Sequence, residues 1–468
     1  MKVLKFGGSS LATTNAIVKV VSIIINASKH QNIIVVVSAI GATTDILIKA
    51  AHKAKAKDNT YIELIQGLEN NHISIIKNLG LTNSKSNIIS HVKEKFLELQ
   101  KLCKGCYMIE DLTTKTLAKI MTYGEYLAAV IMAEVLNHES KTVFKDSREL
   151  IVTDNSYLNA CVSFKETYIN CQGYFTVNLN QIYVLPGFIA QSKQGNETTL
   201  GRGGSDYSAA IFAAALHAEE LQIWTDVNGM FTANPAIVKQ ARPILDMSYE
   251  EAMEMSYFGA HVIYPPTIQP VLQKNITIRI KNTFNPKHPG TLISDKSKKK
   301  GAVTGISYIE DIALLTLEGS GMIGIPGISK RLFKVLANEH INVVLITQAS
   351  SEHSICVGIY EKDVDTAISK IDLEFSFEIK QHAIHYTHAE NHLSIIALIG
   401  DRMKNHQGLS GQMFSALGKN NVNIRAIAQG ASEKNISAVI KQSDAKKALT
   451  TLHEQFFEEP IKQLNLFV

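Results

Sequence analysis

The first 37 residues constrain the fold more than any other part of the chain. A short β-type stretch over residues 2–6, apolar at Val3, Leu4 and Phe6, runs into Gly7 and Gly8, and the pattern of an amphipathic helix follows. The next apolar segment, Ile33–Val37, consists of five consecutive β-branched residues, which is typical of a strand buried on both faces. Together these segments predict a right-handed βαβ unit, and therefore a parallel sheet with ligands beyond the carboxyl ends of its strands.

The turn after the first strand is a candidate anion site. Gly7 and Gly8 let the backbone approach a ligand closely and leave N–H groups for phosphate oxygens, while Lys5 supplies a positive charge. The lysine precedes the glycines, whereas in a Walker loop it follows them, so any phosphate chemistry must be completed elsewhere in the chain. On its own, such a turn is more often a plain strand-to-helix connection.

A second glycine-rich stretch, residues 198–208, follows a predicted strand and leads into a small-residue helix predicted over residues 209–217. The stretch carries Arg202 and Asp206, and a guanidinium group near a helix N-terminus suits a carboxylate or a phosphate. Two such turns in one α/β domain favour phosphate chemistry.

Other segments complete the predicted N-terminal domain. Residues 50–140 are helical in pattern, and within them Glu125 is either an ordinary first-turn acid of a helix or a ligand-binding group. The strand predicted over residues 221–224 ends in a polar loop at the ligand edge, and residues 276–280 are expected to close the sheet. We predict a domain boundary within residues 285–300.

Composition excludes several classes of protein. Of the 468 residues, 45% are hydrophobic and 19% are charged, as in a soluble globular protein long enough for about three domains. No apolar run approaches a membrane span and no signal peptide precedes the first strand, so we expect a cytoplasmic protein without membrane partners. The net charge of +4 does not indicate nucleic-acid binding. The five cysteines include one isolated CxxC pair, so no protein-bound metal site is predicted.

The sequence beyond residue 301 repeats itself at an offset of 81 residues. The recurring pairs include Gly327 and Gly408, Asn342 and Asn423, and Gln348 and Gln429. Each copy has the pattern of a strand, a glycine loop, an amphipathic helix and a pair of strands, so we predict a compact α+β module present twice. A duplicated module without a nucleophile suggests ligand sensing, and a duplicated packing or dimerisation unit is the alternative.

Four motifs in this order resemble those of the aspartokinases. They are Lys-Phe-Gly-Gly-Ser-Ser at 5–10, Gly-Arg-Gly-Gly-Ser-Asp-Tyr at 201–207, Trp-Thr-Asp-Val at 224–227 and Phe-Gly-Ala at 258–260. The resemblance covers nearly the whole chain. It implies an α/β fold, with an amino-acid-kinase α/β/α sandwich over residues 1–295 and two α+β ACT regulatory modules over residues 301–385 and 386–468.

Within the family, Gly321-Met322 and residues 344–348 are similar to the kinase half of bifunctional aspartokinase–homoserine dehydrogenases. Residues 464–468 resemble the opening strand of the dehydrogenase, and no GxGxxG follows them. We therefore expect no reductase activity, and either a truncated fragment or a natural single-function relative.

The resemblance implies transfer of the ATP γ-phosphoryl group to the β-carboxylate of L-aspartate. The product would be 4-phospho-L-aspartate, in the first step of lysine, threonine and methionine biosynthesis, and Mg²⁺ would be held mainly through the nucleotide phosphates. By position, the resemblance assigns catalysis to Lys5 and Asp206, aspartate binding to Ser38, Thr44, Glu125, Arg202 and Ser205, and nucleotide binding to Lys5, Gly7, Gly8, Ser9, Thr225, Asp226 and Phe231.

The implied roles follow the charges of the substrates. Lys5 would neutralise charge on the transferring phosphoryl group, and Asp206 would hold the network that positions Lys5. Arg202 would clamp the α-carboxylate of aspartate, and Glu125 would face its ammonium group.

The repeats would provide regulation. Gln348 and Gln429 are implied contacts for an amino-acid effector, threonine or lysine, because an amide matches ammonium and carboxylate groups. ACT modules commonly pair between chains, so the resemblance also implies a homodimer or a larger homo-oligomer.

The sequence departs from the family on the predicted nucleotide side. Where relatives usually read Tyr-Thr-x-Asp-Pro-Arg, this chain has Asn234 and Ala236, and His261 replaces the lysine of Gly-Ala-Lys. The loss of two cations predicts weaker ATP binding, a changed nucleotide preference or a largely regulatory paralogue. Two alternatives remain open: another acyl-phosphate-forming kinase of this fold, acting for example on glutamate, and a non-catalytic amino-acid sensor.

Overall fold

The chain forms two compact units. The computed structural model describes residues 1–29, 31–81, 87–175, 181–259, 262–295, 297, 301–348, 354–404, 406–430 and 432–458. Unit 1 comprises Met1–Met230, Pro243–Tyr249 and Val262–Lys298, and unit 2 comprises Phe231–Arg242, Glu250–His261 and Lys299–Val468. The domain limits expected from the sequence stay predictions, because they divide the linear chain and not the compact units. None of the described helices is long and apolar enough to cross a membrane.

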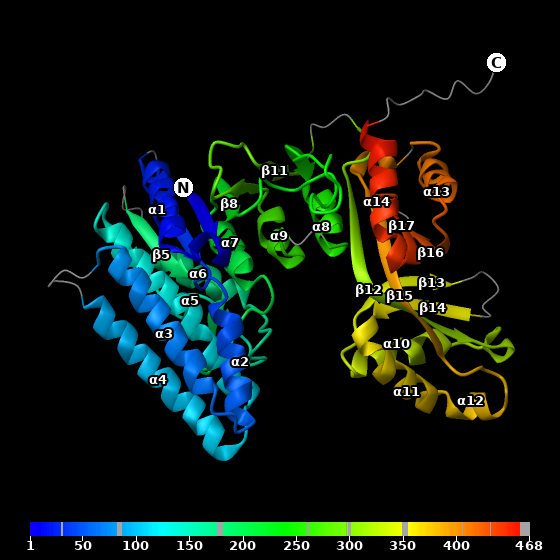
Figure 1. Ribbon diagram of the computed structural model, residues 1–468, viewed down its shortest axis with the longest axis horizontal. Helices are drawn as coiled ribbons and strands as arrows, with labels where there is room; N and C mark the ends of the chain where they lie inside the picture. The colour runs from blue at the N-terminus through cyan, green and yellow to red at the C-terminus, as the bar shows by residue number, and fades with distance from the viewer. Residues whose placement is uncertain are drawn as a thin grey trace. The chain divides into compact units, whose positions relative to one another are not determined.

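Unit 1 is built on an eight-stranded mixed sheet (Figure 1). In spatial order the strands are β3 (Thr142–Phe144), β5 (Ile182–Pro186), β2 (Ile33–Val37), β1 (Lys2–Phe6), β8 (Glu220–Thr225), β10 (Thr277–Asn282), β11 (Thr291–Ser294) and β9 (Asp246–Ser248). The six strands from β3 to β10 are parallel to their neighbours, which confirms the predicted parallel sheet. A separate small sheet contains β4 (Val152–Thr153), β6 (Ile189–Ser192) and β7 (Glu197–Thr199).

The far edge of the large sheet differs from the prediction. Residues 276–280 were expected to close the sheet, but β11 pairs antiparallel with β10, and β9 follows β11. β11 lies inside the segment that we predicted to be a domain boundary. Its four residues follow a run rich in Pro and Gly, so the sequence pattern there is too short to predict a strand.

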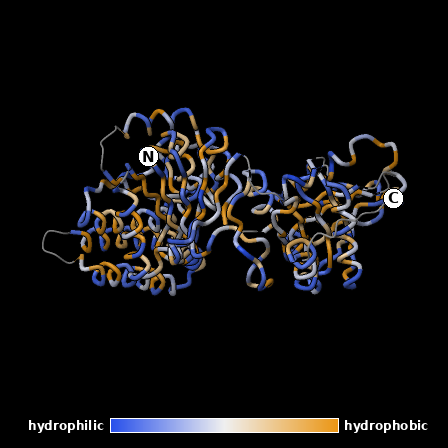
Figure 2. Tube along the Cα trace, turned by 90° about the horizontal axis from the view of Figure 1, so that it is seen from above, coloured by the Kyte–Doolittle hydropathy of each residue, from blue (hydrophilic) through white to orange (hydrophobic). Residues whose placement is uncertain are grey.

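Helices cover both faces of the large sheet, which confirms the predicted α/β/α sandwich. Leu4, Phe6 and Val35 point to one face and pack with α1 and with the group α2 to α5. On the opposite face, α7 contacts β1, β2 and β8. Hydrophobic and hydrophilic residues alternate along the helices (Figure 2), as expected of helices that bury one face. The helices of unit 1 are α1 (Thr14–Ser28), α2 (Thr43–Lys55), α3 (Tyr61–Asn78), α4 (Ile88–Ile109), α5 (Thr114–Asn137), α6 (Phe164–Tyr174), α7 (Gly204–Ala215) and α9 (Pro265–Leu272), whereas α8 (Tyr249–Tyr257) belongs to unit 2 from Glu250 onward.

Two helix boundaries differ from the predictions and bear on function. α5 begins after Thr113, whose side chain caps the helix by accepting a hydrogen bond from the N–H of Thr116. Glu125 therefore lies in the middle of α5, and its interpretation as a first-turn acid is wrong. α7 begins at Gly204 and not at residue 209, so Asp206 lies in its first turn. In both cases polar residues that line a cavity interrupt the apolar pattern and hide part of the helix in the sequence.

Unit 2 contains a six-stranded antiparallel sheet made by the two repeats (Figure 1). Its order is β13 (Val343–Gln348), β14 (Ser354–Tyr360), β12 (Gly305–Glu318), β15 (His388–Ile399), β17 (Asn435–Lys441) and β16 (Ile424–Gln429). The helices are α10 (Ile328–Asn338), α11 (Val364–Glu374), α12 (Ser376–Lys380), α13 (Leu409–Lys419) and α14 (Ala445–His453). The offset of 81 residues relates β13 to β16, β14 to β17 and α10 to α13, which confirms the predicted duplication.

Two short segments from earlier in the chain also belong to unit 2. Ala233 is buried in the same hydrophobic cluster as the second repeat. The hydroxyl of Thr232 lies 2.9 Å from Nε2 of His453. In the second segment, the Glu251 carboxylate accepts a hydrogen bond from the N–H of Asp401 at 3.0 Å. The chain segments before and after the unit 1 segment Pro243–Tyr249 thus both belong to unit 2.

Candidate active site

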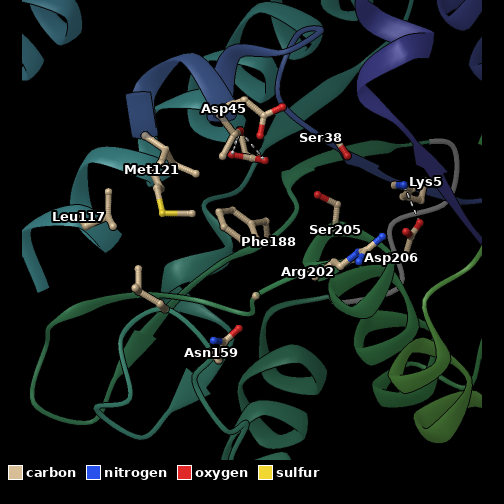
Figure 3. A pocket seen from close by; sticks show the side chains of 17 residues that line it. Lys5, Ser38, Asp45, Leu117, Met121, Asn159, Phe188, Arg202, Ser205 and Asp206 are labelled. Carbon is tan, nitrogen blue, oxygen red and sulfur yellow. Dashed lines mark hydrogen bonds and ion pairs between the residues drawn. The ribbon is translucent and has the colours of Figure 1, made fainter. Parts of the chain in front are cut away.

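A cavity of about 480 Å³ lies in unit 1, near the carboxyl ends of the parallel strands (Figure 3). It is lined by every residue that was predicted to act in catalysis or aspartate binding: Lys5, Ser38, Thr44, Glu125, Arg202, Ser205 and Asp206. These residues come from β1, the loop after β2, α2, α5, the turn between β7 and α7, and the first turn of α7. The structure therefore brings together side chains that are about 200 positions apart in the sequence.

Lys5 and Asp206 form an ion pair in this cavity. Successive side chains of a strand point to opposite faces, so Lys5, between Leu4 and Phe6, points away from α1 and toward the first turn of α7. The Lys5 Nζ lies 2.6 Å from Oδ1 of Asp206, and only 10% and 13% of the two side chains are exposed. A positive charge fixed in this way is able to stabilise negative charge that enters the cavity.

Two glycines permit the turn that places Asp206. Gly203 has φ = +67°, and a Cβ atom there would lie 2.3 Å from Cβ of Tyr264. A Cβ atom on Gly204 would lie 2.6 Å from Cδ2 of Phe188. The glycine-rich stretch therefore serves close packing and a left-handed backbone, in addition to any contact with a ligand.

Glu125 is a buried carboxyl group on the wall of the same cavity. Only 5% of the residue is exposed, and Oε1 accepts a hydrogen bond from the Thr44 hydroxyl at 3.2 Å. Burial raises the pKa of Glu125 to about 8, and the nearby Asp45 adds to the rise, while the hydrogen bond from Thr44 opposes it. Glu125 forms no ion pair with any residue that the structure describes, so a cationic ligand group would find it without a competing partner.

Arg202 and the two serines complete the polar lining. Arg202 is exposed and makes no ion pair with another described side chain. Figure 3 shows its guanidinium group on the same side of the cavity as Lys5 and Asp206, with Ser38 and Ser205 beside them. The cavity thus presents two cationic groups at one end and the Glu125 carboxyl elsewhere on its wall, an arrangement that suits a zwitterion carrying additional negative charge.

The predicted nucleotide-binding residues of unit 1 lie at the ends of two neighbouring strands. Gly7, Gly8 and Ser9 follow β1. Thr225 is the last residue of β8, and Asp226 is the first residue of the loop after it. The N–H of Gly7 donates to the carbonyl of Trp224 at 3.2 Å, which holds the two strand ends together. These residues do not line the cavity described above, and Phe231 belongs to a segment of unit 2. Their role in nucleotide binding stays a prediction.

The two predicted effector residues occupy equivalent positions in unit 2. Gln348 is the last residue of β13 and Gln429 the last residue of β16, the two edge strands of the sheet, and both are exposed. The Gln429 side-chain oxygen accepts a hydrogen bond from the Ser410 hydroxyl at 3.3 Å. Their role in effector binding also stays a prediction.

Two of the three departures from the family pattern, Asn234 and Ala236, lie in the segment 231–242 of unit 2. Oδ1 of Asn234 accepts a hydrogen bond from the N–H of Ala236 at 3.0 Å. The asparagine therefore stabilises the turn in the same way as an aspartate could at this position. Ala236 is exposed. His261, the third departure, lies outside the described residues.

Several cavity residues were missed in the sequence. Asp45, Met121, Asn159 and Phe188 line the cavity together with the predicted set (Figure 3). Asp45 follows the predicted buried strand at the ligand edge, so its position offered a usable signal. Met121, Asn159 and Phe188 are ordinary in type and spacing, and only the fold places them at the site.

Comparisons with known proteins agree with this geometry. The sequence model of the amino acid kinase family matches residues 1–282, and that of an ACT domain matches residues 315–375 and 396–456. The chain is 35% identical over 461 residues to bifunctional aspartokinase/homoserine dehydrogenase 2, chloroplastic, of Arabidopsis thaliana, which covers 97% of this chain and 50% of the relative. It is 31% identical over 469 residues to aspartokinase 1, chloroplastic, of the same plant, which covers 97% of this chain and 80% of the relative.

Solved structures give the same result. The structure of E. coli aspartokinase III with aspartate and ADP has a TM-score of 0.84 and 26% identity, and covers 98% of this chain and 100% of that one. Its complex with lysine and aspartate has a TM-score of 0.78 and 27% identity, with the same coverage. The chain spans about half the length of the bifunctional relatives that it matches. Since the kinase family model matches more than half of the chain and an aspartokinase is matched over most of its length, the chain belongs to the amino acid kinase family and, within it, to the aspartokinases.

Proposed function

We propose that the protein is an aspartate kinase, which transfers the γ-phosphoryl group of ATP to the β-carboxylate of L-aspartate. The observation that carries this proposal is the convergence of the Lys5–Asp206 ion pair, Arg202 and Glu125 in one cavity. L-Aspartate has one ammonium group and two carboxylates, and the cavity offers one carboxyl group and two cationic groups. The related E. coli enzyme crystallised with aspartate and ADP supports the same choice of substrates.

The proposed mechanism relies on position and charge. Arg202 holds the α-carboxylate of aspartate through its planar fork, and Glu125 receives the ammonium group, so the β-carboxylate is left to attack the phosphorus atom. Lys5, held by Asp206 at 2.6 Å, stabilises the negative charge on the oxygens of the transferring group. The carboxylate oxygen itself is the nucleophile, and ADP leaves as the bond between the γ-phosphorus and the bridging oxygen breaks, so no covalent enzyme intermediate is needed.

Mg²⁺ is expected to arrive with the nucleotide. Within the part of the chain that the structure describes, no group of three His, Cys, Asp or Glu side chains could hold a metal ion. We expect the nucleotide phosphate oxygens to supply most of the ligands of Mg²⁺, and the bound Mg²⁺ would neutralise phosphate charge.

Regulation by an amino acid is part of the proposal. Threonine or lysine would bind near Gln348 and Gln429, and inhibition requires that the effector binds unequally to two states of the enzyme. The E. coli relative crystallised with lysine and aspartate supports an amino-acid effector. We also propose a homodimer or larger assembly, formed through the repeated modules.

An aspartyl-hydroxamate assay tests the catalytic proposal. Purified protein, ATP–Mg²⁺ and hydroxylamine should give aspartyl hydroxamate with L-aspartate and much less product with L-glutamate as the acceptor. A product with glutamate alone would assign a different acyl-phosphate kinase of this fold. If neither acid gives a product, the catalytic proposal is wrong.

The second candidate is a non-catalytic amino-acid sensor, and Asn234 and Ala236 favour it because two expected charges are missing there. Calorimetric titration with ATP–Mg²⁺ separates the two candidates. A dissociation constant in the low micromolar range would count against a weakened nucleotide site.

A further inference from the structure

A second cavity, of about 200 Å³, lies on another face of α5 and is lined by polar side chains. Its lining residues are Lys95, Glu98, Lys119, Thr122, Tyr123, Tyr126, Arg148 and Glu197. The substrate cavity takes Leu117, Met121 and Glu125 from α5, which are spaced by four residues and share one stripe of the helix. The helix that carries Glu125 therefore has the substrate cavity on one face and a charged cluster on another.

Arg148 is the most connected member of this cluster. It lies in the short helix Ser147–Glu149, and its Nε donates to both carboxylate oxygens of Asp146 at 3.1 and 3.0 Å, while Nη2 lies 2.6 Å from Oδ2. The remaining terminal nitrogen, Nη1, donates to Glu197. The guanidinium carbon also lies 5.2 Å from the ring centroid of Tyr126, which is on α5. The planar group is thus held by three elements at once.

Glu197 connects this cluster to Arg202, the proposed ligand of the α-carboxylate of aspartate. It is the first residue of β7, and Arg202 follows only five positions later. Its other carboxylate oxygen lies 3.7 Å from Nζ of Lys119 on α5. The strand itself has little freedom, because the hydroxyl of Thr199 donates to the carbonyl of Leu158 at 2.8 Å. A displacement of Glu197 would therefore be passed along β7 toward Arg202.

From this connection we propose that Arg148 and Glu197 are positioning residues, which fix the spacing between Glu125 on α5 and Arg202 after β7. This inference rests on the proposed function, in which those two side chains bind the ammonium and α-carboxylate groups of one aspartate molecule. The two groups of aspartate are separated by a single carbon atom, so both contacts form only when α5 and the end of β7 are held in register.

The pairing inside the cluster favours a framework over a second ligand site. Each charged side chain that lines the small cavity already has an opposite charge beside it. The pairs are Lys95 with Glu98 at 2.9 Å, Lys119 with Glu197 at 3.7 Å, and Arg148 with Glu197. A ligand would have to displace one of these contacts, whereas a framework uses all of them.

The test is a set of variants of the full chain, measured in the hydroxamate assay. Arg148→Met keeps much of the length of the side chain but removes the ion pairs of Arg148 with Asp146 and Glu197. Glu197→Gln removes the negative charge of Glu197. For both we expect the KM for aspartate to rise on the order of 10-fold, while the KM for ATP and kcat change by less than about 2-fold. Arg148→Lys restores a charge without the planar fork, so it should recover part of the affinity.

Glu149→Gln is the matched control. Glu149 lies in the same short helix, pairs with Lys145 and has 61% of its side chain exposed. Among the described residues it forms no ion pair with α5 or β7. This variant should leave both KM values unchanged. The double variant Arg148→Met/Glu197→Gln should raise the KM for aspartate no more than the stronger single variant, because both changes break the same connection.

The outcomes separate the inference from the proposed function. An active Arg148→Met enzyme with the wild-type KM for aspartate would overturn the inference and leave the kinase assignment intact. Equal losses for aspartate, ATP and kcat would also overturn it, since they indicate general damage. If the wild-type protein is inactive, calorimetric titration with aspartate alone decides: weaker binding to Arg148→Met than to wild type supports the inference, and equal affinity refutes it.

Discussion

Substitution of Glu125 by Gln should remove one component of the pH dependence of stability in the ligand-free protein. Glu125 is buried, and its pKa is raised from 4.5 to about 8. In the unfolded chain the carboxyl group ionises near pH 4.5, whereas in the folded protein it keeps its proton up to about pH 8. Between these values the folded state binds more protons than the unfolded state, so the free energy of unfolding falls as the pH rises.

The size of the effect follows from the shift in pKa. One pH unit inside this window corresponds to about 1.36 kcal/mol per proton. Raising the pH from 5.5 to 7.5 should therefore lower the wild-type free energy of unfolding by about 2 to 3 kcal/mol through Glu125 alone. Gln does not ionise, so the Glu125→Gln variant should lack this component and become the more stable protein at the alkaline end.

Urea unfolding of wild type and Glu125→Gln at pH 5.5, 6.5 and 7.5 measures this difference, which cancels the titration of all other groups. Calorimetry adds a direct readout: binding of the aspartate ammonium group should release a proton from Glu125 near pH 7, and the variant should release none. A difference in stability that stays constant over this pH range would refute the reasoning.

Three further predictions use other parts of the structure. Arg202→Ala should lower kcat/KM for aspartate by about 2 to 5 kcal/mol in transition-state free energy, because it removes the carboxylate clamp, and steady-state kinetics will show an undiminished value if the assignment is incorrect. Gln348→Ala should relieve inhibition by threonine or lysine while leaving uninhibited activity unchanged, whereas unaltered inhibition curves for both effectors would contradict the predicted role. Gly203→Ala should destabilise unit 1 by about 2 to 5 kcal/mol, because the new Cβ would meet Tyr264 in a left-handed backbone, and an unchanged Tm would disprove this.

Much of unit 1 could be predicted from local sequence patterns. The strand Ile33–Val37 is apolar throughout because helices cover both faces of the sheet, so its sequence alone specified its environment. The repeats of unit 2 were predictable for a different reason, since an offset that is constant over many positions indicates duplicated elements. Family resemblance supplied the roles of Arg202 and Glu125, which local patterns could not.

The errors have a common physical cause. The residues 122–125 and 204–208 are polar or small where they line a cavity or pack closely, so the helical pattern weakens at the functional part of each helix. The cluster around Arg148 could not be found in the sequence at all. Its members lie on α4, α5, the 147–149 helix and β7, and only the folded chain brings their charges together.

Unit 2 is assembled from segments that are distant in the sequence, and this has a consequence for the order in which the chain folds during synthesis. The segments 231–242 and 250–261 leave the ribosome before the strands and helices that enclose them, so Ala233 and Glu251 must wait for residues 301–458 to be synthesised. A fragment that begins near residue 301 would lack both segments and would expose apolar surface of the second repeat to solvent. Such a fragment should aggregate unless a peptide covering residues 231–261 is supplied in trans, which makes co-expression of the two pieces the practical route to studying unit 2 in isolation.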